Sequence, residues 1–374
     1  MRIAINTRFL LNGKMEGFGW YTYEIVKRIV EQHPEHEFYF FFDRPFDKKF
    51  IFGDNVKALT LSPPARHPIL FYLWFDLAVP RALKKHKIDL FFSPDGYLSL
   101  KTKVPQIATI HDINFEHFPK DIPFAARHYL RYFFPKFAKK AVKIITVSDY
   151  SKQDIAKTYG VDSSKIHAIW NGASNVFKPM SEDDIARKRK EISEGKPYFL
   201  FVGALHPRKN LIRLMNAYNL YAQKEGGSAY HLVIVGENLW KNKGFSVHPD
   251  DAVKDKIHFT GRLELEELAK VTGASGALAY VPYFEGFGIP LVEAMKCGIP
   301  IVAGNLTSLP EVAGDTAIYC DPFDEKSIEV ALTEMATNEE LRNTLANKSL
   351  ERSKVFSWDI AAEKIWNVLI SQAK

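Results

Sequence analysis

The chain has 374 residues, of which 46% are hydrophobic and 25% are charged, and its formal net charge is +6. This composition excludes a disordered or fibrous protein, and the length is typical of two domains. Residues 1–175 carry 26 basic and 17 acidic side chains, so this half either meets an anionic partner or carries a chance excess on solvated faces. No nucleic-acid-binding signature accompanies the excess, and we expect no nucleic-acid partner.

Apolar segments of strand length alternate with longer segments of helical period, which predicts an α/β protein with parallel sheets. The strands predicted in the first half are Arg2–Asn6, Phe38–Phe42, Val56–Leu59, Leu90–Ser93, Gln106–Ile110 and Lys143–Val147. The helices predicted there are Gly19–Gln32, Leu70–Lys85, Ala125–Lys140 and Ser151–Tyr159. From Trp170 to Pro197 the alternation lapses, and a charged run predicts a linker with a short exposed helix.

The alternation resumes in the second half. The predicted strands are Tyr198–Val202, His231–Val235, Ile257–Thr260, Gly276–Val281, Ile299–Ala303 and Ala317–Cys320. The predicted helices are Leu211–Lys224, Leu265–Thr272, Pro290–Lys296, Leu309–Ala313, Glu325–Ala336 and Trp358–Ala373. The last helix either closes the second domain or crosses back to the first.

This pattern predicts two Rossmann-like, doubly wound parallel-sheet domains that face a central cleft, with ligands beyond the carboxyl ends of the strands. We expect the first domain to span residues 1–175, a linker to span 176–196, and the second domain to span 197–357. We expect residues 358–374 to cross back to the first domain.

Several protein classes are excluded. The longest uncharged runs, residues 271–284 and 297–310, are shorter than the ~20 residues of a membrane-spanning helix. The strand-like start holds two arginines and predicts no signal peptide. Cys297 and Cys320 lack metal-ligand spacing, which favours a reduced, cytoplasmic protein. No P-loop, zinc or hydrolase motif occurs, and no two aspartates flank a single residue, so we expect neither metal nor cofactor.

A glycine-rich segment containing Gly13, Gly17 and Gly19 separates the first predicted strand from the first helix. Glycines let the backbone approach an anion, and a helix start offers free N–H groups. A dinucleotide fingerprint would place a third glycine at Thr22. The segment is therefore either a structural turn or a loop that closes over a phosphate or an acceptor.

A second segment places Arg208 and Lys209 directly before a predicted helix, after a strand and the turn residue Gly203. Arginine offers a planar fork and lysine a point charge, and both suit a diphosphate. The alternative is a solvated pair of cations.

A third segment carries two glutamates eight residues apart. Glu285 lies on a glycine-flanked loop, and Glu293 lies inside a helix that begins near Pro290. The two carboxylates can bind two hydroxyl-bearing groups of one ligand, while N–H groups of Gly286, Phe287 and Gly288 meet phosphate or sugar oxygens.

A fourth candidate is His111, which follows the predicted strand Gln106–Ile110. That position suits a cleft, but a lone histidine is equally compatible with a structural role. Asp112 is either its partner or the cap of the next turn.

In this order, the segments resemble retaining, nucleotide-sugar-dependent glycosyltransferases of the GT-B fold, a family that includes bacterial mannosyltransferases of the glycosyl transferase group 1 type. The resemblance covers nearly the whole chain, and its most specific element is the Glu-x7-Glu pattern of Glu285 and Glu293. The other segments are Gly17–Glu24, His111–Asp112, Val147–Ser151, Asn171–Gly172, Val202–Asn210 and Ser308–Gly314.

The resemblance implies roles for matching positions. Arg208 and Lys209 would hold the donor diphosphate, Glu285 would contact the transferred sugar, and His111 would lie near its reacting side. The residues implied in donor binding are Gly17, Gly19, Gly203, Phe287, Gly288, Ile289 and Glu293, the last at the ribose. Many relatives have an arginine where this chain has Ala204, so we assign its work to Arg208.

The implied activity is metal-free transfer of a hexose, with mannose favoured, from a nucleoside-diphosphate sugar to a glycan or lipid-linked acceptor in cell-surface polysaccharide assembly. The first domain would be the acceptor side and the second would bind the donor. The alternatives are a non-catalytic sugar-nucleotide-binding protein and an epimerase or phosphorylase of the same fold.

Residues 125–143 combine six cations with aromatic side chains. Such a helix binds an anionic leaflet, which suggests a peripheral position at the inner membrane face. Two alternatives remain, namely contact with an acceptor phosphate and aromatic packing on the sheet. Pro135 is expected to interrupt the helical run.

Overall fold

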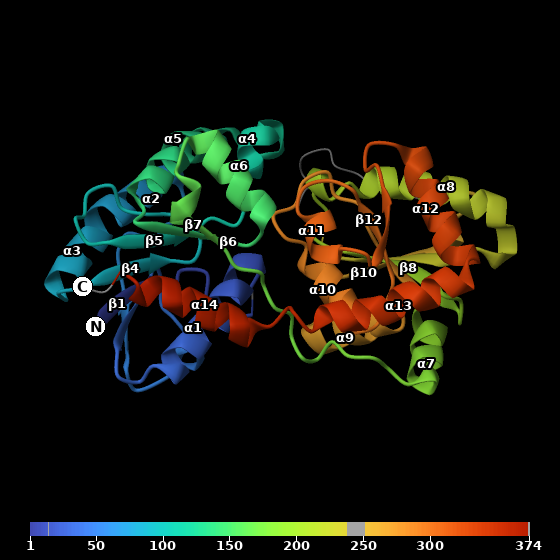
Figure 1. The fold of residues 1–374 in the computed structure, drawn as a ribbon, viewed down its shortest axis with the longest axis horizontal. Helices are drawn as coiled ribbons and strands as arrows, with labels where there is room; N and C mark the ends of the chain where they lie inside the picture. Colours follow the sequence, from blue (N-terminus) through green and yellow to red (C-terminus); the bar gives the residue numbers. More distant parts are fainter. Residues whose placement is uncertain (14, 238–250, 373–374) are drawn as a thin grey trace. The chain divides into compact units, whose positions relative to one another are not determined.

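Two parallel sheets organise the chain, and each belongs to its own unit (Figure 1). The computed structural model describes residues 1–13, 15–237 and 251–372. Unit 1 comprises Met1–Asn171 and Ser357–Lys374, and unit 2 comprises Gly172–Phe356. Residues 176–196, expected to be a linker, lie in unit 2. Lys14 of the glycine-rich segment and residues 373–374 lie outside the described residues.

Unit 1 contains a seven-stranded sheet in the order β3-β2-β1-β4-β5-β6-β7, and every pair is parallel. Its strands are β1 (Arg2–Asn6), β2 (Glu37–Phe42), β3 (Val56–Thr60), β4 (Leu90–Ser93), β5 (Gln106–Thr109), β6 (Lys143–Thr146) and β7 (Ile166–Ala168). Strand β7 was not predicted from the sequence, because three residues are too few to show a strand period. Most residues of the strands are apolar because helices cover both faces of a parallel sheet.

The helices of unit 1 follow the predicted alternation, with one division and with one short helix, α4, that was not predicted from the sequence. They are α1 (Gly17–Gln32), α2 (Pro68–Leu73), α3 (Val79–Lys85), α4 (Asn114–His117), α5 (Phe124–Lys140), α6 (Asp149–Tyr159) and α14 (Trp358–Ile370). The predicted helix Leu70–Lys85 consists of α2, a π-helical turn (Trp74–Ala78) and α3. None of the described helices is long and apolar enough to cross a membrane.

Helix α5 continues through Pro135, contrary to our expectation of an interruption. Proline removes one hydrogen-bond donor from the helix. The buried rings of Phe134 and Phe137 hold the segment against the core on both sides of that position. Burial of these rings therefore outweighs the local cost of the proline.

The last helix, α14, packs on α1 within unit 1 (Figure 1). The indole of Trp366 stacks on His33 with ring centroids 3.9 Å apart. Arg28 Nε donates to Asp359 Oδ1 at 2.6 Å. Aromatic stacking and an ion pair thus attach the final segment to the first helix of the chain.

Unit 2 contains a six-stranded parallel sheet in the order β10-β9-β8-β11-β12-β13. The strands are β8 (Tyr198–Val202), β9 (His231–Val235), β10 (Ile257–Gly261), β11 (Ala277–Tyr280), β12 (Ile301–Gly304) and β13 (Ala317–Cys320). The helices are α7 (Glu182–Ser193), α8 (Leu211–Glu225), α9 (Leu265–Gly273), α10 (Ile289–Lys296), α11 (Leu309–Ala313), α12 (Glu325–Thr337) and α13 (Glu339–Ser353).

Helix α13 was not predicted from the sequence, because its surface is largely polar and few of its residues are buried. The sequence nevertheless contains residues that favour the start of a helix at this position. The side chain of Asn338 accepts a hydrogen bond from Leu341 N at 3.0 Å, and two glutamates occupy the first turn.

Candidate active site

Arg208 and Lys209 lie on a 3-10 turn (Pro207–Lys209) between the carboxyl end of β8 and helix α8. Asn210 follows in the left-handed conformation, with φ 61°. Its buried side-chain amide donates to the carbonyl oxygens of Val281 (2.9 Å) and Pro322 (2.6 Å). Asn210 thereby attaches the turn to the segment that follows β11, which is where Glu285 lies.

Glu285 receives both cations at a single carboxylate oxygen. Lys209 Nζ lies 2.6 Å and Arg208 Nη1 3.1 Å from Glu285 Oε2. The side chains are 14% (Lys209), 19% (Arg208) and 14% (Glu285) exposed, so water screens the cluster weakly. Burial raises the pKa of Glu285, but the charges of Lys209 and Arg208 outweigh it and lower the pKa to about 2. The cluster of two cations and one anion therefore carries one net positive charge.

A tyrosine hydroxyl completes this cluster. Tyr280 is the last residue of β11, and its hydroxyl donates to Glu285 Oε2 at 2.9 Å and accepts from Lys209 Nζ at 2.6 Å. Tyr280 was not predicted from the sequence, because an aromatic residue in a buried strand belongs to no recognisable motif. Only the fold brings its hydroxyl to the two charges.

The backbone of Glu285 is held by the loop after β12. Glu285 N donates to Thr307 Oγ1 at 3.2 Å, and Ser308 Oγ donates to Glu285 O at 2.9 Å. Thr307 and Ser308 belong to the segment 304–311, which joins β12 to α11. In the structure, two of its hydroxyl groups position the acidic loop.

Helix α10 begins where the acidic loop ends. Gly288 has φ +95°, and a Cβ there would collide with Leu291 and Leu309, so this turn requires glycine. Among the described residues, the N–H groups of Phe287, Gly288 and Ile289 donate to no acceptor. They are available to an anion at the positive end of the helix dipole.

Glu293 lies in the second turn of α10. Within the described part of the chain, its carboxylate has no hydrogen-bond or ion-pair partner. Burial raises its pKa to about 7. A buried carboxylate without a partner is costly, so a ligand that donates hydrogen bonds would stabilise it.

Three predicted site residues belong to unit 1. Gly17 and Gly19 lie in the first turn of α1, and a Cβ on Gly19 would lie 2.7 Å from Phe9 O. His111 Nε2 donates to Pro94 O at 2.9 Å, and the ring lies edge-on to Phe18 with centroids 4.9 Å apart. Burial lowers the pKa of His111, which disfavours the charged form of the ring. The structure thus places His111 against Phe18, the residue between Gly17 and Gly19.

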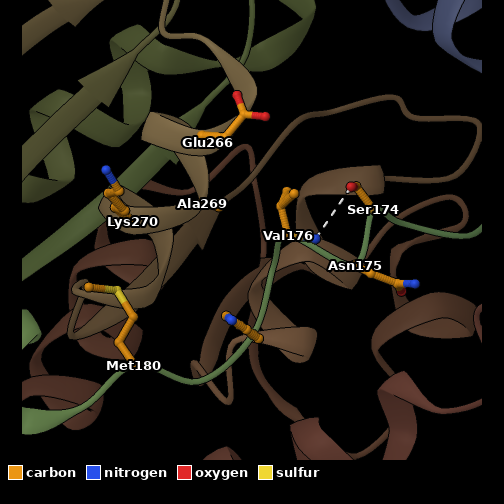
Figure 2. Close-up of a pocket in the computed structure, with 8 residues that line it drawn as sticks. Ser174, Asn175, Val176, Met180, Glu266, Ala269 and Lys270 are labelled. Carbon is orange, nitrogen blue, oxygen red and sulfur yellow. Dashed lines mark hydrogen bonds between the residues drawn. The ribbon is translucent and has the colours of Figure 1, made fainter.

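An open groove of about 510 Å³ lies elsewhere in unit 2, between the segment 174–180 and helix α9 (Figure 2). Lys178, Lys270 and Glu266 supply its charged side chains. None of the candidate site residues lines this groove. Separately, the described residues contain no group of three His, Cys, Asp or Glu side chains that could hold a metal ion.

Comparison with known proteins identifies relatives of both halves. Residues 182–352 match the family described as Glycosyl transferases group 1, and residues 15–174 match Glycosyltransferase Family 4. O-antigen chain mannosyltransferase B of Escherichia coli is 27% identical over 360 residues, which cover 92% of this chain and 93% of that protein. O-antigen chain mannosyltransferase RfbU of Salmonella typhimurium is 33% identical over 280 residues, which cover 74% of each chain.

Solved structures share the architecture. The structure of WaaG, a glycosyltransferase involved in lipopolysaccharide biosynthesis, superimposes with a TM-score of 0.77 at 16% identity and covers 98% of this chain and 99% of its own. HepE of Anabaena in complex with UDP-glucose has a TM-score of 0.77 at 19% identity and covers 99% of this chain and 100% of its own. These likenesses confirm the predicted GT-B fold, and with the sequence matches they show that the chain belongs to the glycosyl transferases group 1 family.

Proposed function

We propose that this glycosyltransferase moves a hexose, with mannose favoured, from a nucleoside-diphosphate sugar to a glycan or lipid-linked acceptor, with retention of configuration and without a metal ion or cofactor. The observation that carries the proposal is the convergence of Arg208 and Lys209 on Glu285 beside the start of α10. The preference for mannose is supported by the names of two relatives, both O-antigen chain mannosyltransferases.

The charges of the cluster suit the departure of a nucleoside diphosphate. The leaving group gains negative charge in the transition state, and cations already held in a weakly screened site stabilise that charge better than water does. Arg208 and Lys209 supply the cations, while the free N–H groups of Phe287, Gly288 and Ile289 supply further donors. The three hydrogen bonds to the Glu285 carboxylate all reach Oε2, so Oε1 can accept a hydrogen bond from a sugar hydroxyl.

The stereochemical part of the proposal is attack on the same face of the sugar that the diphosphate leaves. The acceptor hydroxyl forms the new bond at the anomeric carbon, the bond to the diphosphate oxygen breaks, and that oxygen takes the acceptor proton. Proton NMR of the first-formed glycoside measures the outcome, and an inverted product rejects it. Loss of all activity in EDTA would reject the metal-free mechanism.

The donor experiment tests the function as a whole. The protein is incubated with GDP-mannose, UDP-glucose and ADP-glucose, with and without a lipid-linked glycan acceptor, while release of the nucleoside diphosphate is measured. Acceptor-dependent release of GDP from GDP-mannose is expected. Thermal stabilisation by a nucleotide sugar without release would support the non-catalytic binder, and isomerised donor would support the epimerase. Phosphorolysis of a glycan without a nucleotide would support the phosphorylase.

Nucleotide binding is expected to depend on the charge of Glu293. With a pKa of about 7, this carboxyl is mostly neutral at pH 6 and mostly charged at pH 8. Ribose hydroxyls donate more strongly to the charged form. We therefore expect the Kd of the nucleoside diphosphate, measured by calorimetry, to fall roughly tenfold between pH 6 and pH 8.

The Glu293→Gln variant is the control, since it retains any pH dependence of the nucleotide itself. Equal pH dependence in both proteins would contradict the ribose assignment. The raised pKa means that the folded protein loses stability as the pH rises from the unfolded value of about 4.5 through about 7. Above pH 7, Glu293→Gln is therefore expected to unfold at a higher temperature than the unaltered protein.

We further propose that unit 1 meets an anionic membrane surface at the cytoplasmic face. The structure divides the aromatics of α5 into two sets, because Tyr129, Phe134 and Phe137 are buried while Phe124 and Tyr132 are 70% and 60% exposed. Lys139 and Lys140 at the end of the helix are exposed as well. Exposed rings and exposed cations on the same helix support peripheral binding, with ~1 kcal/mol for each basic residue near the surface.

Sedimentation with vesicles of phosphatidylglycerol and phosphatidylcholine tests this surface. We expect salt-sensitive co-pelleting that falls roughly tenfold or more in the double variant Lys139→Glu, Lys140→Glu. Lys84→Glu, Lys85→Glu on α3 makes the same change in charge on another helix of unit 1 and should pellet like the unaltered protein. Equal pelleting of the two double variants would contradict the assignment to α5.

A further inference from the structure

Tyr280 uses its hydroxyl differently from the other buried tyrosines of unit 2 that we compare with it. The hydroxyl of Tyr198 donates to Val271 O at 2.6 Å, and that of Tyr218 donates to Tyr230 O at 2.8 Å. The hydroxyl of Tyr221 accepts from Tyr230 N at 2.9 Å. These three satisfy backbone groups, whereas Tyr280 bonds to two charged side chains of the candidate site.

The position of Tyr280 is rigid. It is fully buried at the end of β11, an interior strand that pairs with β8 and β12, and it lies beside Ala303 in the register. A buried hydroxyl is costly unless both its donor and its acceptor functions are used. Here the hydroxyl donates to Glu285 and accepts from Lys209, so both of its hydrogen bonds are made to residues of the candidate site.

The hydroxyl also stays neutral. Burial and the neighbouring Glu285 carboxylate raise the pKa of Tyr280 well above 10. A neutral phenol donates to Glu285 at any working pH and adds no negative charge that would oppose a diphosphate.

We propose that Tyr280 is a positioning residue for the transfer reaction, an inference that rests on the proposed function. Its hydroxyl fixes Lys209 Nζ and the Glu285 carboxylate relative to one another. When Lys209 turns an N–H group to the donor diphosphate, Tyr280 still donates to Glu285 and keeps that carboxylate in place for the sugar.

Without this hydroxyl, the side-chain carboxylate of Glu285 keeps only Arg208 and Lys209 as partners among the described residues. Both cations bind the diphosphate during the reaction. The carboxylate would then lose its orientation in the transition state, when it has to contact the transferred sugar. The loss affects the transferred sugar in the transition state and leaves the nucleotide contacts intact. A fall in kcat with little change in nucleotide affinity is the expected pattern.

The experiment compares Tyr280→Phe with Tyr198→Phe, a matched variant that likewise removes a buried tyrosine hydroxyl from a strand of the same sheet. For Tyr280→Phe we expect kcat to fall roughly tenfold, as for the loss of a hydrogen bond to a charged group, and the Kd of the nucleoside diphosphate to stay within about twofold. Tyr198→Phe is expected to retain the kcat of the unaltered protein.

A double-mutant cycle with Glu285→Gln separates positioning from general packing. In the Glu285→Gln background, Tyr280→Phe should lower kcat no further, whereas independent effects would multiply. A kcat for Tyr280→Phe within twofold of the unaltered protein, or an equal fold-loss in both backgrounds, overturns the inference.

The cycle of Tyr280 with Glu285, and a parallel cycle that combines Tyr198→Phe with Glu285→Gln, distinguish failure of the inference from failure of the proposed function. If the unaltered protein turns over no donor, the proposed function fails, and the shifts in unfolding temperature still test the contact. We expect non-additive shifts for Tyr280 with Glu285 and additive shifts for Tyr198 with Glu285. Additive shifts for both pairs would overturn the Tyr280–Glu285 coupling.

Discussion

Replacement of Lys209 by alanine is expected to lower kcat by roughly 10²–10³-fold, the usual loss when one preorganised donor to developing charge is removed. Lys209 Nζ lies in a cluster whose side chains are at most 19% exposed, so water cannot substitute for its charge. Arg208→Ala should show a loss of the same order, because the two cations act on the same leaving group. Steady-state kinetics at saturating donor measures both effects.

Lys190→Ala is the matched control for this prediction, because Lys190 is exposed on α7 of the same unit. Its kcat should equal that of the unaltered protein. Lys209→Ala also removes one partner of Glu285, so thermal unfolding must show that the variant is folded before its rate is interpreted. A folded Lys209→Ala with unaltered kcat would remove Lys209 from the mechanism.

The second large effect is expected for Glu285→Gln, which should lower kcat but increase the affinity for the nucleoside diphosphate. The sugar loses its carboxylate partner, so kcat should fall by about 10²-fold. The nucleoside diphosphate should bind more tightly, by roughly tenfold, because the carboxylate that neutralises Lys209 and Arg208 is gone. Without the anion, the net charge of the cluster rises from one positive charge to two.

Calorimetric titration with the nucleoside diphosphate and steady-state kinetics measure the two parts separately. High salt should reduce the gain in affinity, because it is electrostatic. Glu191→Gln on α7 is a suitable control, since that carboxylate is 62% exposed and bonds only to Lys188 among the contacts described. Weaker nucleotide binding by Glu285→Gln would contradict the competition between carboxylate and diphosphate.

Much of the fold was predictable from the sequence, because burial on both faces leaves a distinct pattern. Six strands of each sheet, from β1 (Arg2–Asn6) to β13 (Ala317–Cys320), were predicted within two residues at either end. The Glu-x7-Glu pattern and the cationic turn indicated the family, which the comparisons confirm. These features are local, since each depends on residue types at fixed spacing.

Only the tertiary structure shows the contacts between residues that are far apart in the sequence. Helix α5 passes through Pro135 because buried rings hold it, and α14 lies on α1 because Trp366 stacks on His33. The convergence of Arg208 and Lys209 on one oxygen of Glu285 required residues 76 and 77 positions apart to meet at the ends of β8 and β11. Tyr280 is the clearest case. In the sequence it is an apolar strand residue, and only the sheet, by placing its hydroxyl between two charges, makes it part of the site.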